Sequence, residues 1–159
     1  MCRIFGQFGK RQINGSLLQE SALSMIHGGP DQQNYVIGSG WAIGNDRLSI
    51  QGIDGGIQPF IETKGISVVF NGEIYNFQEV RNMIPGYQFK TTSDTEVLIA
   101  AYAKWGIDCL QYFKGMFAFA IWDKELKELC LVRDRLGVKP LYYYIDDHKI
   151  LFSSEIRSL

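Results

Sequence analysis

The apolar residues of this chain recur with two different periods, one typical of strands and one typical of helices. The clearest strand covers residues 116–122, where both alternating sets of side chains are apolar, so we expect both of its faces to be covered. The clearest helix covers residues 91–106. Ser93 is its predicted N-cap, Glu96 the capping-box partner of Ser93, and Gly106 the residue that ends the helix.

The same patterns place the other elements. Further strands are predicted at residues 2–8, 34–37, 41–50, 66–70, 129–132, 141–145 and 150–152, and further helices at 16–27, 76–84 and 107–113. The first of these helices begins with a possible capping box of Ser16 and Gln19, and residues 154–157 resemble the opening of another helix. Seven or eight strands, several apolar on both faces, with helices in two groups predict an α+β fold. We expect a four-layer αββα sandwich of two mainly antiparallel sheets with helices outside.

Composition excludes several classes of protein. The 159 residues form one domain with a net charge of −1 and no basic stripe, so no nucleic-acid partner is expected. No apolar run reaches membrane-spanning length, so no membrane partner is expected either. Three widely separated cysteines favour free thiols in a reducing, cytoplasmic compartment, with Cys109 and Cys130 as core residues. The two histidines lack ligand spacing, so we expect no metal site.

The second residue is the first candidate for chemistry. Removal of Met1 would leave Cys2 with a free α-amino group, whose pKa is roughly 7.7–8.0. A thiol and an amine on one residue form a nucleophile with its own base. Two other features are noted. The simple reading of His27 is that it complements the end of a helix dipole, and the glycine-rich residues 52–56 are either a simple connector or, as their composition indicates, a mobile lid.

Eight motifs, in order, give the sequence a family resemblance. They are MCRIFG, HGGPD, RLSI, GIQP, FNGEIYNF, SDTEV, GMFAFAIWD and RDRLGVKPLYY. Together they resemble the glutaminase domain of asparagine synthetases, a class II glutamine amidotransferase with the N-terminal nucleophile hydrolase fold, and the match spans residues 1–159. The resemblance implies an enzyme that hydrolyses glutamine to glutamate and ammonia.

The resemblance also implies a set of site residues. Cys2 matches the nucleophile, and Asn71 and Gly72 match an oxyanion hole made of a side-chain amide and a backbone N–H. Arg47 matches the group that binds the glutamine carboxylate, and Asp94 the group that binds its ammonium. Leu48, Ile50 and Glu73 match positions that line the pocket. Simpler readings are a hairpin turn at Asn71-Gly72 and a helix-dipole role for Asp94.

Three positions depart from the family pattern. Arg3 stands where the family usually has a small residue, Gly28 where it usually has arginine, and Asn45 where histidine is common. Arg3 is therefore a candidate to replace the charge missing at position 28. Against this, strand alternation turns Arg3 to the face opposite Cys2.

The implied partners lie largely outside this chain. The family joins the glutaminase to a C-terminal synthetase domain that binds ATP and Mg²⁺ and receives ammonia. No such domain is present here, and no cofactor is expected in this one. The end of the sequence favours a fragment over a stand-alone glutaminase, and a homodimer is possible. Alternatives are a catalytically impaired glutamine-binding or assembly module, a hydrolase acting on another amide, and a domain serving a sugar or other carboxylate acceptor.

Overall fold

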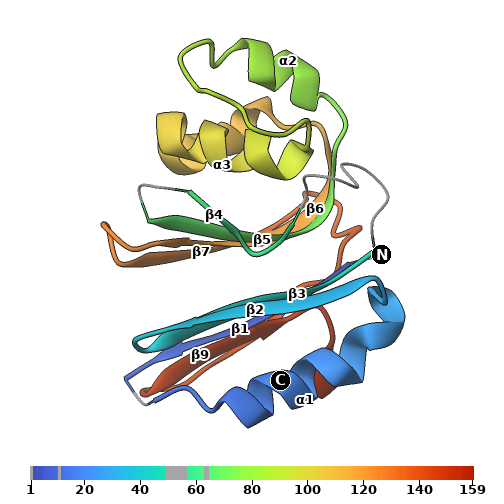
Figure 1. The fold of residues 1–159 in the computed structure, drawn as a ribbon, viewed down its shortest axis with the longest axis vertical. Helices are drawn as coiled ribbons and strands as arrows, with labels where there is room; N and C mark the ends of the chain where they lie inside the picture. Colours follow the sequence, from blue (N-terminus) through green and yellow to red (C-terminus); the bar gives the residue numbers. More distant parts are fainter. Residues whose placement is uncertain (1, 11, 49–56, 63–64) are drawn as a thin grey trace.

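The computed structural model describes residues 2–10, 12–48, 57–62 and 65–159, which form four stacked layers (Figure 1). Two antiparallel sheets lie face to face in the middle. One group of helices covers the outer face of each sheet. The predicted α+β sandwich of four layers is confirmed.

The lower sheet in Figure 1 contains the N-terminal strand at its centre. In the described residues its strand order is β2-β3-β1-β9-β8, with every neighbouring pair antiparallel. The strands are β1 (Arg3–Gly9), β2 (Gln32–Gly38), β3 (Trp41–Arg47), β8 (Tyr142–Ile145) and β9 (Lys149–Ser153). Strands β2 and β3 form a hairpin, in which Gly38 pairs with Trp41. The structure ends β3 at Arg47, three residues before the predicted end.

The upper sheet has the described strand order β4-β5-β6-β7, again antiparallel throughout. Its strands are β4 (Phe60–Ile61), β5 (Ile66–Ile74), β6 (Gly115–Asp123) and β7 (Glu128–Arg133). Two differences from the prediction stand out. The sequence did not predict the two-residue β4, and β5 continues through Asn71 and Gly72 instead of ending at Phe70.

The helices form the two outer layers. α1 (Gly15–Met25), the 3₁₀ helix η1 (Ile26–Gly28) and η3 (Ile156–Ser158) lie below the lower sheet. Above the upper sheet lie α2 (Phe77–Asn82), α3 (Asp94–Trp105) and the 3₁₀ helix η2 (Gly106–Tyr112). None of the described helices has the length and apolar character needed to cross a membrane.

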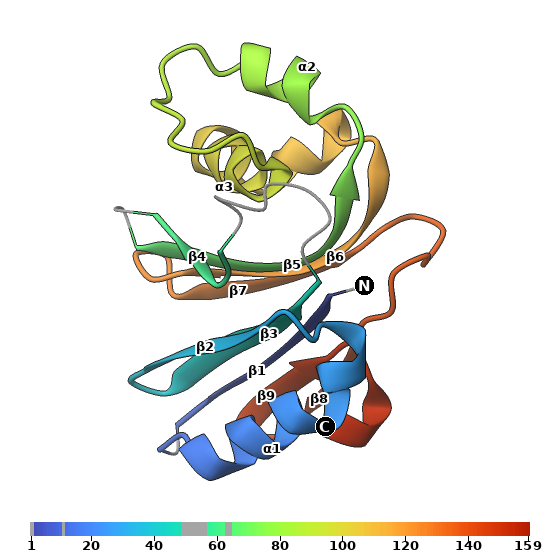
Figure 2. The same ribbon diagram turned by 45° about the vertical axis from the view of Figure 1, so that its right-hand side comes forward.

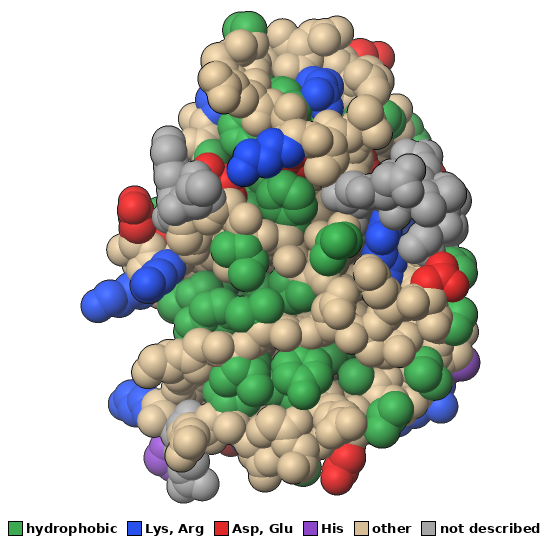
Figure 3. Space-filling model, in the orientation of Figure 1, with side chains coloured by type: hydrophobic (Ala, Val, Ile, Leu, Met, Phe, Trp, Pro, Cys, Tyr) green, Lys and Arg blue, Asp and Glu red, His purple; other side chains and the backbone are tan. Residues whose placement is uncertain are grey.

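Three buried apolar clusters hold the layers together. The largest lies between the upper sheet and its helices and includes Phe119 and Leu98. The second lies between the sheets, where Ala118 and Ala120 of β6 face Ile4 and Ile43. These contacts confirm that β6 is covered on both faces. Figure 3 shows apolar side chains along the hollow between the two sheets on the left. The third cluster, between the lower sheet and α1, is smaller.

The ends of the helices show where local signals succeeded and failed. Ser93 caps α3 as predicted, with its Oγ accepting from the Glu96 N–H at 3.3 Å, and Gly106 ends the helix with φ of +58°. Glu96 itself accepts hydrogen bonds from the N–H groups of Lys90 and Thr91, so the reciprocal bond of a capping box is not formed. The capping box predicted at Ser16 was wrong. The helix begins at Gly15, so Asn14 is the N-cap, and its side chain accepts from the Ser16 N–H at 3.0 Å.

Candidate active site

A pocket opens where β1 and β3 of the lower sheet approach β5 of the upper sheet, near the N-terminal end of the chain (Figure 2). The elements of both halves of the molecule therefore contribute to one site. The described residues that line it are Cys2, Arg47, Leu48, Gln58, Phe70, Asn71, Gly72, Glu73, Ser93, Asp94, Thr95, Met116 and Lys139. The pocket thus brings together every described residue that the sequence assigned to the site. Ile50 and the proposed lid at residues 52–56 lie outside the described residues.

The thiol of Cys2 lies against the backbone that follows β3. Its Sγ is 3.5 Å from the carbonyl oxygen of Leu48, to which it donates, and 3.4 Å from the Leu48 nitrogen, from which it accepts. Cys2 immediately precedes β1, and side chains alternate along a strand, so Cys2 shares the intersheet face with Ile4. The sheet therefore fixes a nucleophilic sulfur at the floor of the pocket, beside the predicted residue Leu48.

Asn71 and Gly72 lie inside β5, opposite Ala118 and Phe117 of β6. The reading of these two residues as a hairpin turn is wrong, because both belong to a continuous strand ladder. Asn71 is 1% exposed, and both side-chain amide atoms lack a hydrogen-bond partner within the described part of the chain. A buried amide without partners carries a penalty of about 1–3 kcal/mol. Its presence in the pocket is the arrangement expected of a group that bonds a ligand.

Gly72 is required for steric reasons. A Cβ at this position would lie 2.3 Å from the carbonyl oxygen of Met116 and 2.6 Å from the Cα of Phe117, closer than atoms can approach. The residue therefore lets β5 and β6 pack closely at the wall of the pocket.

Two buried groups of opposite charge line the pocket. Arg47, at the end of β3, is 5% exposed, and Asp94, at the start of α3, is 7% exposed. Asp94 Oδ2 accepts a hydrogen bond from the Ile74 N–H at 3.1 Å, which joins the helix to β5. A guanidinium and a carboxylate in one pocket match the two charges of a free α-amino acid.

Burial controls the titration of Asp94. It raises the pKa of the Asp94 carboxyl to about 6, and the negative charge of Glu73 acts in the same direction, while the bond from the Ile74 N–H opposes them. The carboxylate is therefore ionised at neutral pH and becomes protonated in mildly acidic solution. Glu73 follows Asn71 on the same face of β5 and lines the pocket.

Several lining residues were not identified from the sequence. Gln58 is 4% exposed and accepts a hydrogen bond from the Phe70 N–H at 2.7 Å, so it fixes the strand before Asn71. Lys139 is 1% exposed and reaches the pocket from the loop between β7 and β8. Both residues belong to motifs that carried the resemblance, GIQP and RDRLGVKPLYY, so the motifs themselves were the available signal.

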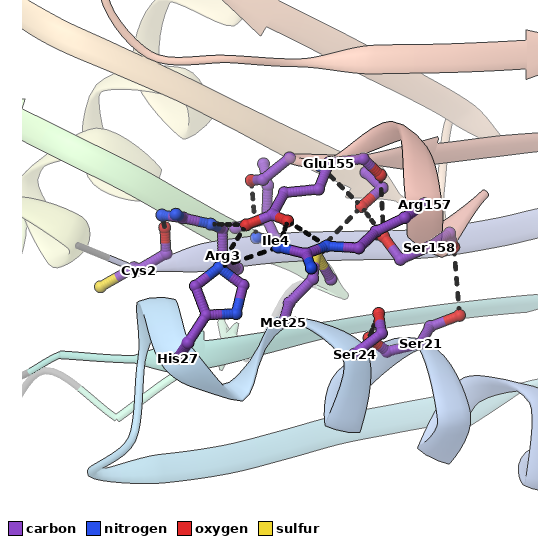
Figure 4. Close-up of polar contacts among 12 residues, drawn as sticks. Cys2, Arg3, Ile4, Ser21, Ser24, Met25, His27, Glu155, Arg157 and Ser158 are labelled. Atoms are coloured by element: carbon purple, nitrogen blue, oxygen red, sulfur yellow. Dashed lines mark hydrogen bonds and ion pairs between the residues drawn. The ribbon is translucent and has the colours of Figure 1, made fainter.

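Behind the nucleophile lies a charged cluster that consists of Arg3, His27, Glu155 and Arg157 (Figure 4). Glu155 Oε1 accepts from Arg3 Nε at 2.6 Å and lies 2.9 Å from His27 Nε2. Glu155 Oε2 accepts from Arg157 Nε at 2.6 Å. His27 lies in the last turn of η1, as the helix-dipole reading expects, and it also contacts a carboxylate on a distant segment.

The two unusual residues at positions 3 and 28 lie against each other. A Cβ on Gly28 would lie 2.7 Å from both Cγ and Cζ of Arg3, so the arginine fills the space in which a side chain at position 28 would begin. Arg3 and Phe5 share the face of β1 toward α1, whereas Cys2 faces the pocket. Arg3 therefore lies behind the nucleophile, and its influence on glutamine affinity stays a prediction.

Asn45 and Asp46 are both fully buried in β3. Burial raises the pKa of the Asp46 carboxyl to about 7, with Arg3 opposing the shift and Glu155 adding to it. No group of three or more histidine, cysteine or acidic residues is placed to hold a metal ion among the residues that the structure describes.

Comparison with known proteins agrees with this geometry. A family model described as a glutamine amidotransferase domain matches residues 1–159. The chain belongs to this family. Among curated relatives, it is 43% identical over 144 residues to asparagine synthetase [glutamine-hydrolyzing] 2 of Bacillus subtilis, with 90% of this chain and 19% of the relative covered. Asparagine synthetase B [glutamine-hydrolyzing] of Escherichia coli is 38% identical, with 100% of this chain and 30% of the relative covered.

The amidotransferase domain thus spans about a fifth to a third of the length of these two curated relatives. Among solved structures, glutamine phosphoribosylpyrophosphate amidotransferase of B. subtilis has a TM-score of 0.79 at 20% identity, with 99% of this chain and 42% of that chain covered. At this identity the likeness concerns the fold, and it agrees with the two-sheet architecture.

Proposed function

We propose that this domain hydrolyses glutamine to glutamate and ammonia with Cys2 as the nucleophile. The observation that carries the proposal is the single pocket that holds the Cys2 thiol, the unpartnered Asn71 amide and the Arg47–Asp94 pair of opposite charges. Free glutamine presents a carboxylate and an ammonium at one end and an amide at the other. The pocket offers complementary groups for all three.

The proposed reaction begins once Met1 has been removed. The α-amine of Cys2 accepts the thiol proton, and the sulfur attacks the side-chain amide carbon of glutamine. The Asn71 amide and the Gly72 N–H donate hydrogen bonds to the oxyanion that forms. The Cys2 α-ammonium then returns its proton to the departing nitrogen, so ammonia leaves and a thioester to Cys2 remains. Water attacks the thioester, releasing glutamate and regenerating the thiol.

We further propose that the ammonia serves an ATP-dependent synthetase. The relatives with the printed name asparagine synthetase are three to five times as long as the aligned region, which supports a synthetase domain or subunit as partner. ATP and Mg²⁺ would bind to that partner, and asparagine is the product that those names favour. A cytoplasmic setting agrees with the three free cysteines. A homodimer remains part of the hypothesis.

The decisive experiment is intact mass spectrometry with and without 6-diazo-5-oxo-norleucine, a glutamine analogue that alkylates nucleophilic thiols. We expect loss of the Met1 mass and one adduct, mapped to Cys2. Cys2→Ala should carry no adduct and release no ammonia, whereas Cys130→Ala is the matched control and should be labelled normally. A protein that retains Met1 or stays unlabelled would contradict the proposed function.

A second measurement tests the oxyanion hole. Asn71→Ala should lower kcat by about 10²–10³-fold, as is typical when one oxyanion donor is removed. Its KM should change much less, because the bond forms chiefly in the transition state. Loss of affinity with unchanged kcat would assign Asn71 to substrate binding instead.

A further inference from the structure

The loop that joins β7 to β8 is held from both sides by two charged side chains. Asp134 accepts hydrogen bonds from the N–H groups of Leu136, Val138 and Lys139 at 2.9–3.1 Å and from Phe117 of β6 at 3.2 Å. Arg133 donates to the carbonyl oxygens of Gly137 and Lys139, both at 2.8 Å. Gly137 has φ of +66°, a conformation that favours glycine. The loop therefore has a defined shape without being a helix or strand.

The consequence of this shape is the placement of Lys139. Both its backbone N–H and its carbonyl oxygen are bonded, so its Cα is fixed relative to β6. Its side chain is 1% exposed and lines the same pocket as Cys2 and Glu73. Lysine is almost never fully buried unless it is paired, so the groups around this side chain matter.

The charges around Lys139 are those of the active site. Burial lowers the pKa of its ammonium, while the acidic groups of Glu73, Asp134 and Cys2 favour the charged form and Arg3 opposes it. Lys139 therefore lies in the same pocket as the groups whose charge it can influence, Cys2 and Glu73. The defined shape of the loop and the burial of the Lys139 side chain are two independent observations, and both indicate that Lys139 acts in this pocket.

We propose that Lys139 is a further functional residue of this site, whose buried positive charge stabilises the negative charge that develops on the Cys2 sulfur and on the attacked amide oxygen. The inference rests on the proposed glutaminase function. Glutamine enters with a neutral side-chain amide, and charge appears there only on attack. A fixed cation near the reacting atoms therefore stabilises the transition state more than the bound substrate. Arg47 and Asp94 act on the other end of the ligand.

The test compares two alkylating reagents that differ in charge. Iodoacetate is an anion and iodoacetamide is neutral, so the ratio of their rates at Cys2 reports the local electrostatic potential and cancels changes in thiolate content. Peptide mass mapping separates Cys2 from Cys109 and Cys130. We expect Lys139→Met to lower this ratio about five- to tenfold, the effect of one charge at close range in a partly buried site.

Two variants serve as controls. Lys139→Arg keeps the charge and should keep most of the ratio. Lys114→Met removes a lysine whose side chain is 77% exposed, and it should leave both the ratio and the activity unchanged. In glutamine hydrolysis, Lys139→Met should lower kcat at least about tenfold with a smaller change in KM.

The outcomes separate this inference from the proposed function. An unchanged ratio in folded Lys139→Met would overturn the role of Lys139, even if the wild type hydrolyses glutamine. A lowered ratio supports it even if no glutaminase activity is found. If Lys139→Met does not fold, the proposal is tested by the reagent-rate ratio of the native wild type. Its ratio at Cys2 should exceed that of the chain unfolded in urea, and an equal or lower ratio would overturn the proposal.

Discussion

The two halves of the pocket are built in different ways. The upper half provides Asn71, Gly72 and Asp94 from β5 and α3, which lie on the largest apolar cluster of the described chain. The lower half provides Cys2, which immediately precedes β1, and Arg47 at the end of β3. Its outer face has only a small apolar cluster under α1.

Polar contacts replace apolar packing in the lower half. The charged cluster around Glu155 joins β1 to η1 and η3, and Ser154 is bonded to both backbone groups of Ile4, through its Oγ at 2.9 Å and its N–H at 2.8 Å. The difference teaches that Asn71 and Gly72 are held mainly by apolar packing, whereas Cys2 is held partly by ion pairs and polar contacts of the elements beside it. The two halves should therefore respond differently to cavities, salt and pH.

The largest expected effect is a cavity in the upper half. Phe119 is fully buried, and Phe119→Ala should lower the free energy of unfolding by about 3–5 kcal/mol. Met25→Ala, in the small cluster under α1, should cost about 2 kcal/mol, the lower end for such a change. Urea denaturation measures both values. As a control, Tyr143→Ala at a 67% exposed position should change stability by less than about 0.5 kcal/mol. Equal losses for Phe119→Ala and Met25→Ala would remove the contrast.

The second effect concerns acid and the upper half. The pKa of Asp94 is raised to about 6, so its carboxylate becomes protonated below that pH and no longer binds an ammonium. We expect kcat/KM for glutamine to fall by an additional factor of about ten per pH unit between pH 6 and pH 4, beyond the loss caused by protonation of the Cys2 α-amine. Asp94→Asn should be weakly active and should lack this additional loss. A profile that is flat down to pH 4.5 in the wild type would contradict the assigned role of Asp94.

The third effect concerns salt and the lower half. Arg3→Met removes the bond to Glu155 and should lower the free energy of unfolding by about 2 kcal/mol, a value typical of a hydrogen bond between charged groups. Part of this loss should disappear in 0.5 M NaCl, since salt weakens the wild-type pair. Lys114→Met, which breaks an exposed pair 4.0 Å from Glu79, should cost less than about 1 kcal/mol. If Arg3→Met leaves both stability and glutamine affinity unchanged, Arg3 does not compensate for Gly28.

The smallest effect is the response of Asp46 to pH. Its pKa is about 7 in the folded protein against an ordinary value of 3.8, so the unfolded chain loses its proton first. The folded state therefore loses stability as the pH rises from about 4 to about 7. Asp46→Asn should remove this slope and raise the melting temperature by a few degrees at pH 8, with a smaller gain at pH 5. A constant difference across this range would show that Asp46 does not titrate as expected.

Local signals in the sequence predicted most elements because they act over a few residues. The Ser93 cap, the stop at Gly106 and the doubly apolar strand β6 all depend on neighbours within one or two turns. The motifs likewise placed Cys2 and Asn71 in the site. Strand order and the extent of β5 depend instead on pairing between distant segments, which the spacing of apolar residues along the chain does not reveal.

Contacts between distant residues explain what the sequence did not reveal. Lys139 and Cys2 line the same pocket although 137 positions separate them in the chain. The proposed role of Lys139 depends on a loop shape set by Arg133 and Asp134. The packing of the Arg3 side chain against Gly28 likewise joins distant residues, because β1 and η1 come together only in the folded sheet. Alternation along β1 did predict correctly that Arg3 faces away from the pocket.

In the loop that presents Lys139, one carboxylate, that of Asp134, accepts hydrogen bonds from four backbone N–H groups. Burial disfavours the charge of Asp134, but the four N–H bonds more than offset this and hold its pKa below the ordinary value. The stabilisation is present above pH 3.8 and is lost as the pH falls through the folded-state pKa. Protonation of the Asp134 carboxylate would then weaken its hydrogen bonds to four backbone N–H groups at once. In hydrogen–deuterium exchange, the amides of residues 136, 138 and 139 should be protected like those of a strand and should lose protection together in acid.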